Sequence, residues 1–246
     1  MKKVVMANWK MNKTGEQTRA FFEEFAKKAV GKDNDIVFCV PFTALRTAGE
    51  YSDKLGFTLG AQNFHPAKNG AFTGEVSVEM LKEVSVKVVL CGHSERRAIF
   101  NETDEFVNEK VRSALAGGLY VCICIGETLS QREAGETEAV LKTQLKKSLA
   151  GVYLSKSDFY TLAVAYEPVW AIGTGVVATL EQIEAAHKFI KSELNKMYSS
   201  VLIPILYGGS VNEKNAPEIM AIKNVNGVLV GGASLDPEKF AQIAKN

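Results

Sequence analysis

Residues 160–167 read YTLAVAYE, a short apolar run that ends in a carboxylate. Seven further runs of this type occur along the chain: VVMANWK (4–10), IVFCVPF (36–42), FTLGAQ (57–62), VKVVLCG (86–92), YVCICIG (120–126), IPILYGG (203–209) and GVLVGG (227–232). Short runs rich in Val, Ile, Leu and Cys are typical of parallel strands that are buried on both faces. The sequence therefore predicts eight parallel strands.

Amphipathic segments separate these runs. Residues 16–30 place Phe21, Phe22, Phe25 and Ala29 on one helical face, and residues 179–197 repeat the pattern. Successive runs start 21 to 43 residues apart, which leaves room for a helical crossover each time. Eight strand–helix units in about 250 residues favour a closed (β/α)8 barrel of the α/β class, with outer helices, over an open doubly wound sheet. Because no linker-like segment interrupts the pattern, we expect a single domain over residues 1–246.

The composition is that of an ordinary globular protein, with 46% hydrophobic and 23% charged residues. A net charge of +1 gives no reason to expect nucleic acid or a membrane surface as a partner, although a local site for a small anion stays open. No apolar run approaches the ~20 residues of a membrane span, and the N-terminus is not typical of a secretion signal. We therefore expect a cytoplasmic protein.

Four cysteines, Cys39, Cys91, Cys122 and Cys124, lie inside apolar runs, and none belongs to a C-x-x-C pair. We expect reduced, packed thiols rather than disulfides or zinc ligands. We also expect Cys122 and Cys124 to point to opposite faces of their strand.

Polar residues and glycine pairs gather at the carboxyl ends of the runs. They are Asn8, Lys10, Gln62, His93, Glu127, Glu167, residues 208–210 (GGS) and residues 231–232 (GG). In a (β/α)8 barrel these ends surround one mouth, where the loops that follow the strands form the active site. The distribution therefore predicts an enzyme whose site lies at this mouth.

Three of these residues suit acid–base chemistry. Glu167 precedes an apolar loop that can cover it, and burial strengthens a carboxylate as a base, whereas an uncovered glutamate would only be solvated. His93 precedes a predicted helix whose positive end disfavours an imidazolium; the alternative is a capping or packed histidine. Lys10 can point inward with Asn8 to stabilise an oxyanion or a phosphate, rather than lie at the surface. His187 lies on the apolar face of a predicted helix, and we interpret it as structural.

The glycine pairs end two neighbouring runs, and the second pair leads into a predicted helix start. Tight turns would explain them, but exposed N–H groups beside a helix N-terminus also bind phosphate, and we favour that interpretation. The letters GTGVVA (173–178) fit the G-x-G-x-x-A pattern of a dinucleotide-binding turn. In that fold the first glycine follows the strand directly, whereas residues 168–172 intervene here after Glu167. We therefore treat the match as accidental.

Along its whole length the chain resembles the triosephosphate isomerase family. The resemblance rests on ANWKMN (7–12), GAFTGEVS (70–77), CGHSERR (91–97), CIGET (124–128), AYEPVWAIGTG (165–175), YGGSV (207–211) and LVGGASL (229–235). It implies a TIM barrel that interconverts dihydroxyacetone phosphate and D-glyceraldehyde 3-phosphate through an enediol(ate), in glycolysis and gluconeogenesis. It also implies a homodimer and a reaction without metal or organic cofactor.

The resemblance assigns a role to each matching residue. Glu167 would be the base, and His93 would be a neutral electrophile that serves both substrate oxygens; this family is itself the standard example of that pairing. Lys10 would supply positive charge, Asn8 would orient a substrate oxygen, and Glu95 would hold Lys10. The residues expected to bind the phosphate are Gly173, Ser210, Gly231 and Gly232.

A lid over the site is a further implication. It would consist of Pro168, Val169, Trp170, Ala171, Ile172, Gly173, Thr174, Gly175, Val176, Val177 and Ala178. Ile172 and Leu229 would press on Glu167 when the lid closes. Val176 departs from the family, because many members have a lysine there, and its effect on lid opening stays open.

Residues 62–76 form a long predicted loop that contains Phe64 and Phe72, which a monomer would leave poorly covered. In the family this loop, with Thr73 at its tip, reaches beside Asn8 and Lys10 of the neighbouring subunit. At this stage two other functions stay open: another phosphate-binding barrel isomerase or lyase, and a non-catalytic module that binds phosphate or a dinucleotide.

Overall fold

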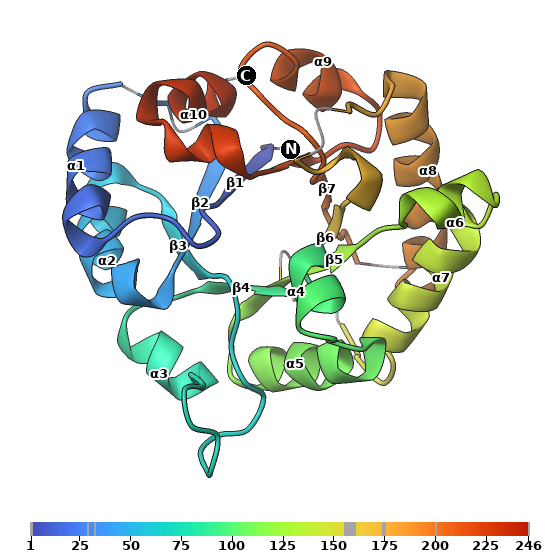
Figure 1. Cartoon of the computed structure of the whole chain (residues 1–246), viewed down its shortest axis with the longest axis horizontal. Coiled ribbons are helices and arrows are strands. Elements are labelled where there is room, and N and C mark those ends of the chain that lie inside the picture. Colours follow the sequence, from blue (N-terminus) through green and yellow to red (C-terminus); the bar gives the residue numbers. More distant parts are fainter. Residues whose placement is uncertain are drawn as a thin grey trace.

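Eight parallel strands form a closed barrel, in the order in which they occur along the chain (Figure 1). The computed structural model describes residues 2–28, 30–31, 33–154, 161–173, 176–199 and 201–245. The strands are β1 (Val4–Asn8), β2 (Asp35–Val40), β3 (Thr58–Ala61), β4 (Val88–Cys91), β5 (Tyr120–Ile125), β6 (Leu162–Tyr166), β7 (Ile205–Tyr207) and β8 (Gly227–Val230). Each pairs with the next, and β8 pairs with β1, with Ala7 opposite Val230. The predicted (β/α)8 TIM barrel is confirmed.

Most of the helices surround the barrel on its outer side, whereas α4 is drawn nearer the centre of this ring (Figure 1). They are α1 (Gly15–Ala26), α2 (Leu45–Leu55), α3 (Val78–Glu83), α4 (Ser94–Ile99), α5 (Asp104–Ala116), α6 (Leu129–Glu133), α7 (Thr137–Ser148), α8 (Leu180–Met197), α9 (Ala216–Ala221) and α10 (Pro237–Ala244). Three 3-10 turns, η1 (Phe42–Ala44), η2 (Val169–Ala171) and η3 (Gly232–Leu235), complete the described elements. Helix α8 starts at a capping box in which Thr179 and Gln182 bond each other's backbone N–H groups.

The core has two layers. Inside the barrel, side chains such as Met6, Leu90 and Leu206 pack together. Between the barrel and the helices lies a larger cluster, in which the fully buried Trp9 packs against Phe21 and Phe22 of α1. Ala29, which was predicted on the same helical face, lies outside the described residues.

All four cysteines are buried free thiols, as predicted. The expectation that Cys122 and Cys124 face opposite sides of β5 is wrong, because residues two apart on a strand point to the same face. Both side chains lie inside the barrel, together with Cys39, whereas Cys91 lies in the outer layer. No helix in the described part of the chain is long and apolar enough to cross a bilayer.

Candidate active site

A cavity of about 600 Å³ opens at the carboxyl ends of the strands. It brings together residues that are far apart in the sequence but that follow β1, β4, β6, β7 and β8. Among its lining residues are Asn8, Lys10, His93, Glu167, Ile172, Gly173, Ser210, Leu229, Gly231 and Gly232. Of the predicted catalytic and phosphate-binding residues only Glu95 is not in this lining, and it contacts Lys10 directly.

Lys10 reaches the cavity through an unusual backbone conformation. Its φ of 52° lies in the left-handed region, which costs a non-glycine residue about 1–2 kcal/mol. Two side-chain contacts hold the segment: Asn8 Oδ1 accepts the Lys10 N–H at 3.1 Å, and Gln62 Nε2 donates to the Lys10 carbonyl at 3.0 Å. Trp9 lies between Asn8 and Lys10 in the sequence, and its buried indole N–H donates to the Ser234 carbonyl at 3.1 Å. The Lys10 ammonium then pairs with Glu95 Oε1 at 2.6 Å.

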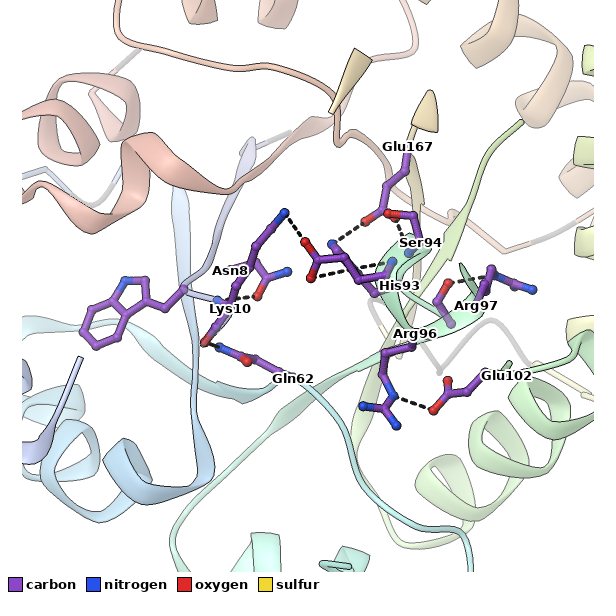
Figure 2. A network of polar contacts seen from close by, with 12 residues as sticks. Asn8, Lys10, Gln62, His93, Ser94, Arg96, Arg97, Glu102 and Glu167 are labelled. Carbon is purple, nitrogen blue, oxygen red and sulfur yellow. Dashed lines mark hydrogen bonds and ion pairs between the residues drawn. The ribbon is translucent and has the colours of Figure 1, made fainter. Parts of the chain in front are cut away.

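His93 caps the N-terminus of α4 with its own ring. Its Nδ1 accepts the backbone N–H of Glu95 at 3.3 Å, so in the neutral ring the hydrogen is on Nε2. The Glu95 carboxylate is 3.7 Å from Nδ1, which is too long for a hydrogen bond. With Nδ1 accepting from the backbone, Nε2 is the ring nitrogen that can donate, and it lies on the side of Glu167 (Figure 2).

Glu167 follows β6, and the residue is only 1% exposed. Its Oε2 accepts the backbone N–H of Ser94 at 2.9 Å. Its Oε1 lies 3.3 Å from His93 Nε2 but has no hydrogen-bond partner of good geometry among the described residues (Figure 2). This unpaired oxygen is therefore available to accept a proton from a molecule bound in the cavity.

Two glycines leave room for Glu167. A Cβ on Gly208 would lie 2.9 Å from Glu167 Cγ, and a Cβ on Gly126 would lie 1.7 Å from the Glu167 carbonyl oxygen. The sequence pattern had assigned Gly208 only to phosphate binding and had given Gly126 no role. Neither contact was visible in the sequence, because the partner is 41 residues away in each case.

The predicted phosphate-binding residues lie together at one side of the cavity. At the start of η3 the N–H groups of Gly232 and Ala233 make no hydrogen bond to any described residue. Ser210 lines the cavity as well, and its N–H and its hydroxyl both donate to the Ala171 carbonyl, at 3.1 and 2.7 Å. In this conformation Ser210 therefore holds the lid segment.

The first part of the lid segment is held by Glu127. One oxygen of this fully buried carboxylate accepts bonds from Tyr166 Oη at 3.1 Å, Trp170 Nε1 at 2.9 Å and Arg132 Nη1 at 3.2 Å. Burial raises the pKa of the Tyr166 hydroxyl, so the phenol remains the donor. The sequence had marked Glu127 and Gln62 as mouth residues without a role, and the structure gives both a structural one.

Further along the lid, Gly173, Val176 and Val177 are exposed. Gly173 has φ of 67° and lies at the cavity edge, and Val176 and Val177 are about half exposed. Thr174 and Gly175 lie outside the described residues. Because the η2 turn separates β6 from Gly173, the GTGVVA letters do not follow a strand directly, as a dinucleotide-binding turn would require.

The predicted dimer loop projects from the barrel between β3 and α3 (Figure 1). Its base is held to α5, where Ser113 Oγ donates to the Pro66 carbonyl at 2.7 Å. The expectation that a monomer would leave Phe64 poorly covered is wrong, since this ring is fully buried in its own chain. Phe72 is 46% exposed and packs against the ring of His65, with ring centroids 4.0 Å apart. Thr73 is exposed at the tip.

Comparison with known proteins agrees with this architecture and site. The family model described as triosephosphate isomerase matches residues 3–246. A triosephosphate isomerase of Aquifex aeolicus is 46% identical, over 99% of this chain and 98% of its own, and one of Solibacter usitatus is 48% identical, over 99% of both chains. The crystal structure of triosephosphate isomerase from Bartonella henselae superposes with a TM-score of 0.86 at 36% identity, over 99% of this chain and 98% of its own.

Proposed function

Because this chain belongs to the triosephosphate isomerase family, we propose that the cavity at the barrel mouth is its active site, with the residue roles set out below. The activity is that of the family: the enzyme is an intramolecular aldose–ketose isomerase that interconverts dihydroxyacetone phosphate and D-glyceraldehyde 3-phosphate, a reaction of glycolysis. One observation carries the assignment of residues: a buried carboxylate oxygen lies 3.3 Å from the imidazole Nε2 of His93 in a cavity that the ammonium group of Lys10 also lines.

Glu167 is the base. It removes a proton from the carbon next to the substrate carbonyl, and the bonding electrons move to the carbonyl oxygen to give an enediol(ate). The same carboxyl group then returns the proton to the neighbouring carbon. Since 3.3 Å between Glu167 Oε1 and His93 Nε2 leaves no space for the reacting atoms, binding must separate the two side chains. The bond to the Ser94 N–H is one that the carboxylate can exchange for this purpose.

His93, Lys10 and Asn8 serve the oxygens of the substrate. The Nε2–H of His93 donates to an oxygen on which negative charge develops and transfers a proton between the two oxygens. The ammonium of Lys10, held by Glu95, stabilises the same charge. The side-chain amide of Asn8 lies beside it and orients the substrate oxygen.

The phosphate binds to Gly231, Gly232, Ser210 and Gly173. Free N–H groups at a helix start are a ready anion site, and Gly232 and Ala233 offer two of them. A phosphate would compete with the Ala171 carbonyl for the donors of Ser210. Ligand binding therefore frees the Ala171 carbonyl from Ser210 and lets the lid, residues 168–178, close over the substrate. Closure excludes water, which protects the enediol(ate) from losing its phosphate.

The chain works as a homodimer in the cytoplasm. Support for the dimer comes from the projecting loop with its half-exposed Phe72 and from Met11, which follows Lys10 and is 96% exposed. A second copy would cover both side chains and place Thr73 beside Asn8 and Lys10 of the neighbouring subunit. Support for the cytoplasm comes from the free cysteines and the glycolytic family.

Replacement of Glu167 tests the proposed function. Purified enzyme given glyceraldehyde 3-phosphate should form the ketose isomer, and Glu167→Gln should lower kcat by about 10²–10⁴-fold, the range for a positioned acid–base group. The variant should still bind a phosphorylated analogue of the enediolate. Glu193→Gln is the matched control, because Glu193 is also buried but pairs with Lys196 on α8, outside the cavity. Unchanged turnover in Glu167→Gln would exclude Glu167 as the base.

A further inference from the structure

The backbone of Glu167 lies directly against the end of β5. The Glu167 N–H donates to the Ile125 carbonyl at 2.7 Å. The next residue, Gly126, approaches so closely that a Cβ there would lie 1.7 Å from the Glu167 carbonyl oxygen and 2.5 Å from the carbonyl carbon. The position of Gly126 therefore limits where the backbone of Glu167 can lie.

On its other side Gly126 has no neighbouring strand in the part of the chain that the structure describes. Strand β4 pairs with β5 only as far as Cys91 opposite Ile123. The chain then turns away at Gly92, which has φ of 70°, and enters α4. The end of β5 extends past its partner, and the backbone N–H and C=O of Gly126 need other partners.

The side-chain amide of Gln144, on α7, supplies both. Its Oε1 accepts the Gly126 N–H at 2.8 Å, and its Nε2 donates to the Gly126 carbonyl at 3.1 Å. One amide group therefore makes the pair of bonds that a neighbouring strand would make. The side chain of Arg97 likewise bonds backbone groups where β4 and β5 separate. It donates to the carbonyl of Gly92 at 2.7 Å and to that of Cys124 at 3.3 Å.

We propose that Gln144 is a positioning residue for the catalytic base, acting through Gly126. The two bonds hold Gly126 against the carbonyl of Glu167 and so fix the base relative to His93. Gln144 does not line the substrate cavity, so its effect is on the chemical step rather than on substrate binding. This inference rests on the proposed function, in which Glu167 is the base.

Gln144→Met is the first test, since methionine has a similar length but makes neither bond. A displacement of the base by about 1 Å can lower the rate by about 10²-fold, so we expect kcat to fall about 10–100-fold. KM and the affinity for a phosphate-ester inhibitor should change less than about twofold, because binding residues are untouched. A mainly structural role would instead lower the melting temperature without a selective loss of kcat, and that result would overturn the proposal.

Asn108→Leu is the matched control. The Asn108 amide also joins backbone groups, donating to the carbonyls of Ser148 at 3.0 Å and Ala150 at 2.9 Å, at the end of α7. Its loss should lower stability and leave kcat unchanged. An equal loss of kcat in both variants would mean that any weakened contact of α7 has this effect, and the role of Gln144 would not be specific.

Gln144→Glu provides a rescue that depends on pH. The protonated carboxyl has the shape and the donor and acceptor of glutamine, whereas the carboxylate has no donor for the Gly126 carbonyl. The ratio of kcat in this variant to kcat in the wild type should therefore rise as the pH falls. Because the ordinary pKa of glutamate is about 4.3, the ratio is measured from about pH 4 to about pH 6, and a constant ratio over this range contradicts the two-bond account.

Combination with Glu167→Asp separates this inference from the proposed function. Asp lacks one methylene, so its carboxylate is already displaced, and Gln144→Met should lower kcat less in this background than in the wild type. If the two losses simply multiply, Gln144 does not act through Glu167. If Glu167→Asp and Glu167→Gln both retain turnover, the proposed base is wrong, whatever the effect of Gln144.

Discussion

Glu167 is placed by small neighbours as much as by polar ones. Its carboxylate touches the Ser94 N–H and the His93 ring, and glycines lie against both its side chain and its backbone. Any residue other than glycine at position 208 would have a Cβ, and this Cβ would lie 2.9 Å from Glu167 Cγ. Gly208 therefore contributes to the position of the base as well as to the phosphate loop.

Gly208→Ala should lower kcat by about 10–100-fold, because the new methyl group displaces the carboxylate from its position. The effect on KM should be small, since the phosphate donors at Gly232 and Ala233 are unchanged. Gly49→Ala in helix α2 is the control: its Cβ would meet neighbours at an ordinary 3.6 Å, and turnover should not change. Wild-type kcat in Gly208→Ala would show that the side chain of Glu167 moves away from the methyl group without loss.

Helix α8 lies outside the cavity and carries a histidine that makes the stability of the fold depend on pH. Its His187 is fully buried beside the rings of Tyr166 and Tyr207, and Nδ1 lies 3.2 Å from the Asn224 carbonyl. Burial lowers the pKa of His187 to about 4, although the bond to Asn224 acts in the opposite direction. This histidine, interpreted from the sequence as structural, is neutral in the folded protein at neutral pH.

The folded-state pKa of about 4 lies below the ordinary value of 6.5, so the unfolded chain binds the proton more readily. The free energy of unfolding should therefore be highest above pH 6.5 and decrease as the pH falls from there to 4, by about 3 kcal/mol in all. His187→Gln keeps a donor for Asn224 but does not ionise. Urea titrations at several pH values should show a flatter dependence in this variant, and parallel curves would disprove the account.

The barrel could be predicted from the sequence more completely than the contacts that place the catalytic base and the lid. Eight apolar runs were enough to predict the barrel, because each buried strand carries its own pattern. Asn8, Lys10, His93 and Glu167 were found because they end such runs. Gly126, Gln144 and Ser94 were not assigned roles, because each acts on Glu167 from a distant part of the chain, and only the closed barrel brings them together. Ser210 was expected on the phosphate, and its present bonds to Ala171 depend on the lid conformation.

At the scale of the whole molecule, exposed apolar side chains point to a second copy. If the proposed dimer forms, Phe72→Asp should convert it to a monomer in sedimentation experiments and lower kcat, because the proposed contact of Thr73 with the neighbouring Lys10 would be lost. The single chain should remain folded, since Phe72 is already 46% exposed. Tyr153→Asp is the control, because Tyr153 is a 91% exposed aromatic residue outside the projecting loop. A wild-type monomer with full activity would exclude the dimer as a requirement.

The buried cysteine thiols make it possible to measure how often the protein opens transiently. Burial raises the pKa of the Cys39 and Cys124 thiols well above their usual range and that of Cys91 to about 12. An alkylating reagent needs both access and a thiolate, and the intact barrel denies it both. The rate of labelling in dilute buffer therefore reports excursions from the native state, without any added probe.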